Sequence, residues 1–524
     1  MIAKVFKDWN EWNPQLVREL KGRLNPRSLR LVLYLSAITQ CGIVGFSSQR
    51  DCADWSQSGS GSCQHYQLAI RWEWVFQTFS FILPLLLLVG GVYLLSSDLV
   101  KEQRRGTLNF LRLSPRTSQN ILLGKLLGVP VLLYLGVGFA VPLHLIGAIA
   151  AGIPLGWVLG FYAVILALGA FLYLGALLNA LFVAEVQYQA IISSALAGWL
   201  GYSLVSFILY YLSWKNSDFN EFAFKWFFSE DLGKNYNLAF AWLCFSFMGG
   251  IYWIWQGLNR YFKNPNGTLL SKAQSYRLTA SFQIWILGMF YPWISPSAID
   301  EDLMPMMFMM SILTLVLFLL IIPAISPRRQ TLLDWARYAH ETRRLGLKRL
   351  RTKWQDLIWG EKSPSIVAIA INLGIVTAIW VPWIMLWKGS FEENFQVAIG
   401  LMMTFNLIWI YNMIAQLLTL IKFPKPALLS MGIVMGTLTL PPLVFVLFFK
   451  TVSVNTTLWM LFVFGSPWFA LIEAYPMAIL ISLLGQLAAI AVLTLTLTHQ
   501  IHRAGASHSK LLFAVNPTPI APKA

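Results

Sequence analysis

Gly124 and Lys125 supply two residues of the phosphate-binding loop found in ATP-hydrolysing proteins. A complete loop has the spacing G-x-x-x-x-G-K-[ST], because its backbone wraps the phosphates and its hydroxyl binds Mg²⁺. Here Leu126 follows the lysine, and the upstream glycine is missing. We therefore predict that the chain does not hydrolyse ATP, is not an enzyme and binds no cofactor of its own.

Side chains that could hold a metal ion are sparse. His499 and His502 lie one helical turn apart, but no cysteine or carboxylate near them completes a ligand set. His144 lies inside an apolar run, where a packed or hydrogen-bonded histidine is commoner than a proton relay. The sequence therefore predicts no metal site.

Cys52 and Cys63 are candidates for a covalent cross-link. Both lie in a polar loop rich in Ser and Gly, whereas Cys41 and Cys244 lie in apolar runs. We expect this loop outside the cytosol, where disulfides persist. A Cys52–Cys63 disulfide and two free thiols are both open at this point.

The lysine, histidine and cysteine residues named above lie in, between or directly after long apolar runs, and these runs must position them. Of the 524 residues, 57% are hydrophobic and 12% are charged, which excludes a soluble globular protein. A spanning helix needs roughly 20 apolar residues. The runs of suitable length are 29–46, 74–97, 121–148, 157–182, 187–212, 238–258, 281–296, 304–325, 366–387, 395–421, 428–449 and 474–498. We predict an all-α polytopic membrane protein of about 12 transmembrane helices, in two six-helix halves, 1–260 and 261–524.

Charged loops between the runs predict the orientation. Intervals 98–120, 259–280 and 326–362 are basic, whereas 297–305 and 388–395 are acidic or balanced. Basic loops stay on the cytosolic side. We therefore expect both termini in the cytoplasm, with the protein in the bacterial inner (plasma) membrane. The same rule accounts for the net charge of +16 without a nucleic-acid partner.

Three segments are expected at the membrane surface rather than across the bilayer. Residues 4–24 place apolar side chains three or four apart among lysines and arginines, which predicts an amphipathic interfacial helix that is bent or restarted at Pro14. Segments 219–232 and 458–474 are too charged or too short to span. We predict that they form re-entrant or interfacial helices on the outer side.

The polar stretch 98–125 carries the most specific motif. Its charges are costly to place in hydrocarbon, so we predict a short helix, half-buried at the cytosolic face, with a turn at Ser114-Pro115. The motif residues and their charged neighbours are Glu102, Arg104, Arg105, Gly106, Thr107, Leu108, Arg112, Ser114, Pro115, Gly124 and Lys125. The order Glu, Arg-Gly-Thr-Leu, Ser-Pro, Gly-Lys resembles the loop after the second of six spans in type-2 ABC-transporter permeases. Asn109 departs from that pattern, in which an acidic residue is common.

The resemblance implies a function and a set of partners. In that family the loop holds a coupling helix that docks on separate ABC ATPase subunits, which carry the ATP and Mg²⁺. The chain would then be the membrane-spanning permease of an ATP-driven exporter that works by alternating access. Membrane lipid is an expected partner, and either one permease chain or two could complete the pathway. The N-terminal helix and the re-entrant segment before the sixth span are similar to the architecture of that family and extend the resemblance over the first 260 residues.

The basic segment 326–362 occupies the corresponding place in the second half. Its sequence Arg329-Gln330-Thr331-Leu332 echoes Arg105-Gly106-Thr107-Leu108, so Arg328 and Arg329 join the expected coupling residues. The segment lacks the later Gly-Lys. It is either a degenerate second coupling element or an interfacial helix that binds anionic lipid.

Two other functions stay open from the sequence alone. One is a membrane-embedded enzyme that acts on lipid or lipid-linked sugar, although no recognisable catalytic set is grouped. The other is a secondary transporter. Proton-driven transporters usually carry a chain of intramembrane acids, and the predicted spans hold few ionisable groups. The cargo cannot be read from the sequence.

Overall fold

The computed structural model describes residues 12–55, 63–182, 188–211, 226–227, 232, 235–291, 303–344, 350–386, 391–422, 426–449, 468–471 and 475–514. The chain divides into two compact units. Unit 1 comprises Met1–Lys225 and Ser229–Lys263, and unit 2 comprises Trp226–Phe228 and Asn264–Ala524. The predicted halves 1–260 and 261–524, each with six spans, stay a prediction.

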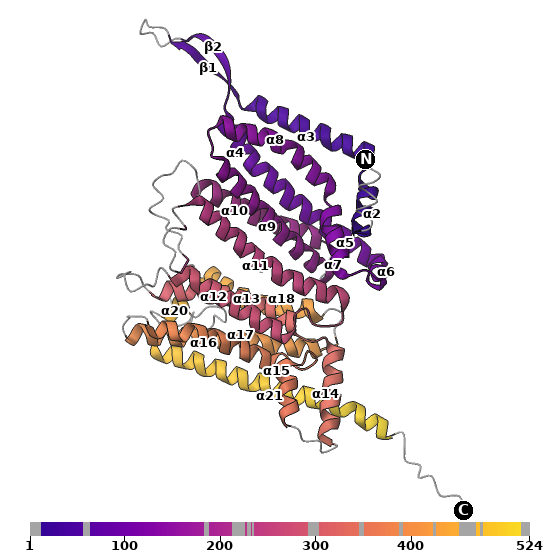
Figure 1. Ribbon diagram of the computed structural model, residues 1–524. Helices are drawn as coiled ribbons and strands as arrows, with labels where there is room; N and C mark the ends of the chain where they lie inside the picture. Colours follow the sequence, from indigo (N-terminus) through magenta and orange to yellow (C-terminus); the bar gives the residue numbers. More distant parts are fainter. Residues whose placement is uncertain are drawn as a thin grey trace, which may run out of the picture. The chain divides into compact units, whose positions relative to one another are not determined.

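Unit 1 is a bundle of helices with one β-hairpin. Its elements are α2 (Pro14–Arg23), α3 (Pro26–Phe46), β1 (Ser48–Trp55), β2 (Cys63–Ile70), α4 (Trp72–Leu85), the π-helical η1 (Leu86–Gly90), α5 (Gly91–Arg104), α6 (Thr107–Leu113), α7 (Ser118–Gly128), α8 (Val131–Ala150), α9 (Leu155–Phe182), α10 (Gln189–Tyr211) and α11 (Tyr236–Lys263). Figure 1 shows α2, α6 and α7 at one end of this bundle and the hairpin at the other.

The helix α2 begins at the proline that the sequence indicates. The side chain of Asn13 caps it, because its Oδ1 accepts a hydrogen bond from the backbone N–H of Leu16 at 3.0 Å. Proline at the first helical position costs no hydrogen bond, since that N–H would have no partner within the helix. A helix thus begins at Pro14, where the sequence predicts a bend or a restart, while residues 1–11 lie outside the described part of the chain.

The hairpin occupies the loop in which the two cysteines lie. Strands β1 and β2 pair antiparallel, with Cys52 opposite Tyr66 and Trp55 opposite Cys63. The side chains of Cys52 and Cys63 fall outside the described residues, so their disulfide stays a prediction. No further strand occurs in the described ranges, and the all-α class holds for the membrane-spanning part.

The second membrane helix of unit 1 changes its winding near its middle. Helices α4 and α5 join through η1 into one continuous helix, Trp72–Arg104, of 33 residues. Within η1, the hydroxyl of Tyr173 donates a hydrogen bond to the carbonyl of Leu87 at 2.7 Å. This hydroxyl supplies a partner for a carbonyl in the π-helical turn, where the regular i→i+4 pattern is interrupted.

Unit 2 is also helical. Its elements are α12 (Lys272–Phe290), α13 (Leu303–Ile325), α14 (Arg329–Arg344), α15 (Leu350–Trp359), α16 (Ile366–Leu386), α17 (Phe391–Leu420), α18 (Pro426–Phe449), α20 (Trp468–Leu471) and α21 (Pro476–Ala514). Figure 1 shows α14 and α15 together at one end of α16 and α17. These two shorter helices carry the basic segment predicted at 326–362.

Ten helices in the described part of the chain are long and apolar enough to cross a membrane. They make the chain an integral membrane protein and match ten of the predicted runs. The other two runs, 281–296 and 428–449, overlap α12 and α18, which are not among the ten. The predicted count of twelve and its division into six and six therefore stay predictions.

Buried polar side chains explain why α12 is less apolar than its neighbours. Asn372 on α16 accepts a hydrogen bond from Thr279 at 2.8 Å and donates one to Ser275 at 3.1 Å. Gln283 donates to Thr314 on α13 at 3.1 Å. These five side chains are fully or almost fully buried. Hydrogen bonds between helices satisfy groups that would be costly beside lipid.

The two predicted re-entrant segments lie largely outside the described residues. Of 219–232, the structure describes Trp226, Phe227 and Leu232, and of 458–474 it describes the short helix α20. Both predictions therefore stay untested.

Candidate functional site at the charged end of unit 1

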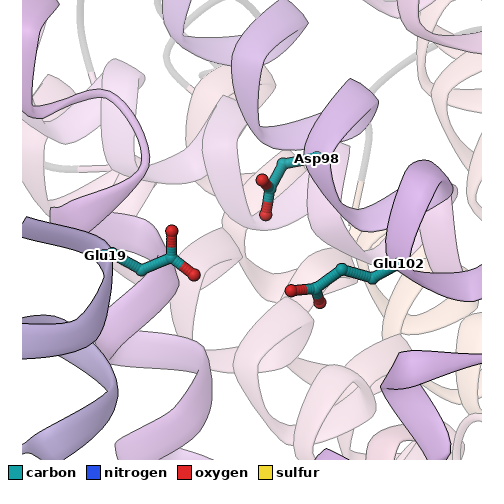
Figure 2. Close-up of side chains that lie close together, drawn as sticks. All are labelled: Glu19, Asp98 and Glu102. Carbon is teal, nitrogen blue, oxygen red and sulfur yellow. The ribbon is translucent and has the colours of Figure 1, made fainter. Parts of the chain in front are cut away.

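Charged side chains from three helices meet around Lys125 on α7. Its Nζ lies 2.8 Å from Asp98 Oδ2, 2.8 Å from Glu102 Oε2 and 3.5 Å from Glu19 Oε1. Figure 2 shows the three carboxylates turned toward a common centre. The lysine side chain is only 1% exposed. One buried ammonium group therefore joins α2, α5 and α7.

Arg23 adds a second cation to this group. Its guanidinium lies 2.7 Å from Asp98 Oδ1 and 3.3 Å from Glu19 Oε2. We call Glu19, Arg23, Asp98, Glu102 and Lys125 the charge cluster. Three carboxylates and two cations give it a formal charge of −1.

The carboxylates of the charge cluster have a spacing that could hold a metal ion. Their ligand oxygens lie within 4.8 Å of one another, and Mg²⁺ and Ca²⁺ prefer such oxygens. The Lys125 ammonium, however, lies within ion-pair distance of all three carboxylates. It already supplies the positive charge that a metal ion would bring, so this geometry favours an ion-pair network.

Burial and the carboxylates act in opposite directions on Lys125. Burial alone would lower the pKa of its ammonium, but the charges of Asp98, Glu102 and Glu19 outweigh it and raise the pKa above its ordinary value. Lys125 is therefore fully protonated at neutral pH. Such a pair is costly to break from one side, because the remaining charges stay in a poorly hydrated place.

Close backbone contact brings α2 into reach of Lys125. A Cβ atom placed on Gly124 would lie 2.8 Å from the Leu16 backbone nitrogen, and one on Gly128 would lie 2.5 Å from Glu19 Cβ. Asn13 also donates a hydrogen bond to the carbonyl of Asn120 at 2.8 Å. Gly124 thus has a packing role here, and it stands directly before the residue that closes the cluster.

A tight turn connects α5 to α6. Gly106 has a φ of +72°, in the left-handed region that glycine adopts without steric cost. The hydroxyl of Thr107 donates to the carbonyl of Glu102 at 3.2 Å, and Leu108 is buried. Three consecutive motif residues therefore fix the direction in which α6 leaves α5.

The other end of α6 is also fixed by side chains. The hydroxyl of Ser114 donates to the carbonyl of Leu111 at 2.7 Å, and Pro115 follows it. Thr117 then caps α7 by accepting a hydrogen bond from the N–H of Asn120 at 3.3 Å. The predicted turn at Ser114-Pro115 is present between the two helices.

Exposed apolar side chains on α6 follow exposed basic side chains at the end of α5. Phe110 is 77% exposed and Leu113 is 84% exposed. Arg104 and Arg105, at the preceding turn, are exposed as well. We call these four residues the exposed loop face. Arg112 differs from them, because its guanidinium lies 5.6 Å from the ring centre of Phe262 on α11 and thus packs within unit 1.

The structure adds residues that the motif does not contain. Glu19, Arg23 and Asp98 belong to the charge cluster, yet only Glu102 and Lys125 are among the motif residues. The available signal was local: Glu19 stands among basic residues on an amphipathic helix, four residues before Arg23. Nothing in the sequence pairs Glu19 with a lysine more than a hundred residues later.

The predicted coupling residues of the second half make contacts inside unit 2. Arg329 donates to the carbonyl of Leu420, at the end of α17, at 3.0 Å. Arg328 donates to Asn266 Oδ1 at 3.0 Å. Leu332 is fully buried, as Leu108 is almost fully buried in unit 1. These contacts give both arginines a structural role, and their contact with a partner stays a prediction.

A buried lysine also lies beside the basic segment of unit 2. Lys272 Nζ donates to the carbonyl of Leu357 at 2.7 Å, to Ser363 Oγ at 2.6 Å and to the carbonyl of Pro364 at 3.1 Å. Burial lowers its pKa from 10.5 to about 8, and the charge of Asp356 opposes that shift. The lysine joins the start of α12 to the connection between α15 and α16.

The histidines form no metal cluster in the described residues. His144 is fully buried, with its Nε2 3.0 Å from Ser80 Oγ and its Nδ1 2.6 Å from the hydroxyl of Tyr162. It is a packed, hydrogen-bonded histidine, as predicted. The ring of His502 meets that of His340, with centres 5.7 Å apart. Groups of three or more metal-type ligands in the described residues are confined to the three carboxylates of the charge cluster.

The chain was compared with protein-family models, curated proteins and solved structures. None of them matches. Any assignment of function therefore depends on the geometry of this chain and on the motif in 98–125.

Proposed function

We propose that the chain is the membrane-spanning subunit of an ATP-driven exporter of the type-2 ABC class. The exposed loop face would dock on a separate ATPase, which would carry the ATP and Mg²⁺. The observation that carries the proposal is the combination of this exposed face with the buried charge cluster behind it. An exposed apolar patch rimmed by basic groups is typical of a protein interface.

The charge cluster supplies a route for transmitting movement. Glu102 stands before α6 and Lys125 stands after it, and their ion pair of 2.8 Å closes the base of the loop. Asp98 and Glu102 both lie on the second membrane helix, and Glu19 joins α2 to the same lysine. A displacement of α6 would therefore move these helices as one body instead of bending the loop. Alternating access requires such a connection between the ATPase and the spans.

The remaining parts of the proposal follow from this placement. The basic end of unit 1 would face the cytoplasm, with both termini on that side of a bacterial inner membrane. The segment 326–362 would serve as a second coupling element or as a contact for anionic lipid. Arg328 and Arg329 already bond within unit 2, so we place docking in unit 1 first.

Affinity purification from native membranes tests the proposal. The tagged chain should recover a protein that carries a phosphate-binding loop, identified by mass spectrometry. The double variant Arg104→Glu, Arg105→Glu and the variant Phe110→Asp should lose that protein. Lys21→Glu is the matched control, because Lys21 is exposed on α2 at the same end of unit 1 but outside the loop.

Three results would count against this function. Undiminished recovery of the ATPase by the loop variants would show that the exposed loop face is not the docking surface. Turnover of a lipid by the isolated chain, or transport that collapses with a proton uncoupler but survives ATP depletion, would favour the membrane enzyme or the secondary transporter instead.

A further inference from the structure

An open surface cavity of about 460 Å³ lies at the end of unit 1 opposite the charge cluster. It is bounded by the end of β2, the start of α4 and the end of α8. Its lining residues are Ile70, Arg71, Trp72, Glu73, Trp74, Ala150 and Ala151. It opens to the surface of unit 1.

The cavity lies where membrane-spanning segments end. The span Trp72–Arg104 begins at it, and the span Val131–Ala150 ends at it. From Trp74 to Ser97 that first span is free of charged residues, a length of about 36 Å at the rise of an α-helix and enough to cross the hydrocarbon core. Arg71 and Glu73 therefore lie at the level of the lipid headgroups.

The lining chemistry combines both charges with indole rings. Arginine binds phosphate through two parallel N–H donors. A carboxylate has several acceptor directions and attracts an ammonium group even when it already has a partner. The rings of Trp72 and Trp74 favour the membrane–water boundary and attract cations. Few ligands present a phosphate, an ammonium and an apolar body together, and a zwitterionic phospholipid is one.

The backbone holds these groups in place. The N–H of Arg71 donates to the carbonyl of Ser47 at 3.0 Å, which ties the start of α4 to the end of α3. Arg71 and Trp74 are exposed, while Trp72 and Glu73 are half-buried. All four side chains are therefore at least partly accessible at the surface of unit 1.

We propose that this cavity binds the headgroup of a zwitterionic phospholipid, with the phosphate on Arg71 and the ammonium group on Glu73. The site is independent of the exporter assignment, because no part of it touches the charge cluster or the exposed loop face.

Native mass spectrometry of the delipidated, detergent-purified chain tests this site. Short-chain phosphatidylethanolamine and phosphatidylcholine should bind more tightly than phosphatidylglycerol, which has no ammonium group. Arg71→Gln should weaken all three lipids by about tenfold or more, the loss expected from one charge-assisted hydrogen bond. Glu73→Gln should weaken the two zwitterionic lipids alone. Arg71→Lys should restore part of the affinity.

The controls separate a specific site from general lipid contact. Arg116→Gln removes an exposed arginine next to α6 and should change nothing. Equal binding of all three lipids, or full binding by Arg71→Gln, would overturn the site. Inorganic phosphate or soluble phosphoethanolamine binding as tightly as lipid would overturn the assignment to a lipid. Each variant must keep the elution volume and helical circular dichroism of the wild-type chain.

Discussion

A Cβ atom on Gly124 would lie 2.8 Å from the backbone nitrogen of Leu16 and 3.0 Å from Oδ1 of Asn13. Those two atoms are the donor and acceptor of the bond that caps α2. The glycine before Lys125 therefore leaves room for the start of a helix that precedes it by more than a hundred residues. Packing and charge act at adjacent positions to hold α2 on α7.

Gly124→Ala should push α2 away from α7. We expect the variant to lose about 1–3 kcal/mol of stability, the usual cost of overpacking, and to show faster amide exchange in α2. Gly138→Ala on α8 is the control, since no atom lies within 4 Å of its added Cβ. Exchange in α2 equal to that of the control would contradict the contact.

Lys125→Met should leave three carboxylates facing one another without their central cation. Removing one side of a buried ion pair costs about 3–5 kcal/mol, and we expect the low end because the carboxylates keep 11–22% exposure. Thermal unfolding in detergent measures the loss. Adding Glu102→Gln to this variant should recover part of the stability, because it removes one of the repelling charges. No recovery would mean that the two residues are not coupled.

Gly106→Ala should disturb the turn between α5 and α6. An alanine at a φ of +72° costs about 1–2 kcal/mol in the left-handed conformation. Asparagine tolerates that conformation better, so Gly106→Asn should behave more like the wild type. Amide exchange over residues 105–113 and recovery of the ATPase should both follow the order Gly, Asn, Ala. An alanine variant that matches the wild type in both measurements would remove the role of the turn.

Stability should depend on pH through Lys272. Its pKa is about 8 in the folded protein and 10.5 ordinarily, so the unfolded chain binds more protons between these values. Stability contributed by this group therefore rises as the pH increases from about 8 to 10.5. The measurement is the midpoint of thermal unfolding from about pH 7 to about pH 10, a range chosen to bracket that pKa. This rise with pH should be absent in Lys272→Gln. Lys422→Gln, at an exposed lysine of unit 2, should keep it.

The sequence predicted those features of the fold that depend on residues close together along the chain. Runs of apolar residues marked all ten helices of the described residues that are long and apolar enough to cross a membrane, because hydrocarbon sets their length and composition directly. Pro14 marked the start of α2, and Ser114-Pro115 marked the turn after α6. Each of these features depends on neighbours in the sequence.

Long-range pairings could not be predicted in the same way. Glu19 and Lys125 form an ion pair only because α2 and α7 pack together, and Asn372 is satisfied by side chains on another helix. The basic loops were assigned to the membrane surface by their charge, but charge alone does not show that Arg329 caps α17 or that Arg112 lies over Phe262. Such contacts depend on the tertiary fold.

The π-helical turn Leu86–Gly90 acts as a phase shift between the two halves of the second membrane helix. A π-bulge holds one residue more than a regular turn, and one residue corresponds to a rotation of about 100° around a helix axis. Rewinding the same residues as a regular α-helix would swing Asp98 and Glu102 away from Lys125 by about that angle, whereas deleting one residue there would keep both close to their present positions. The winding of the helix at Leu86–Gly90 therefore sets the direction in which Asp98 and Glu102 point at one membrane surface, several turns further along.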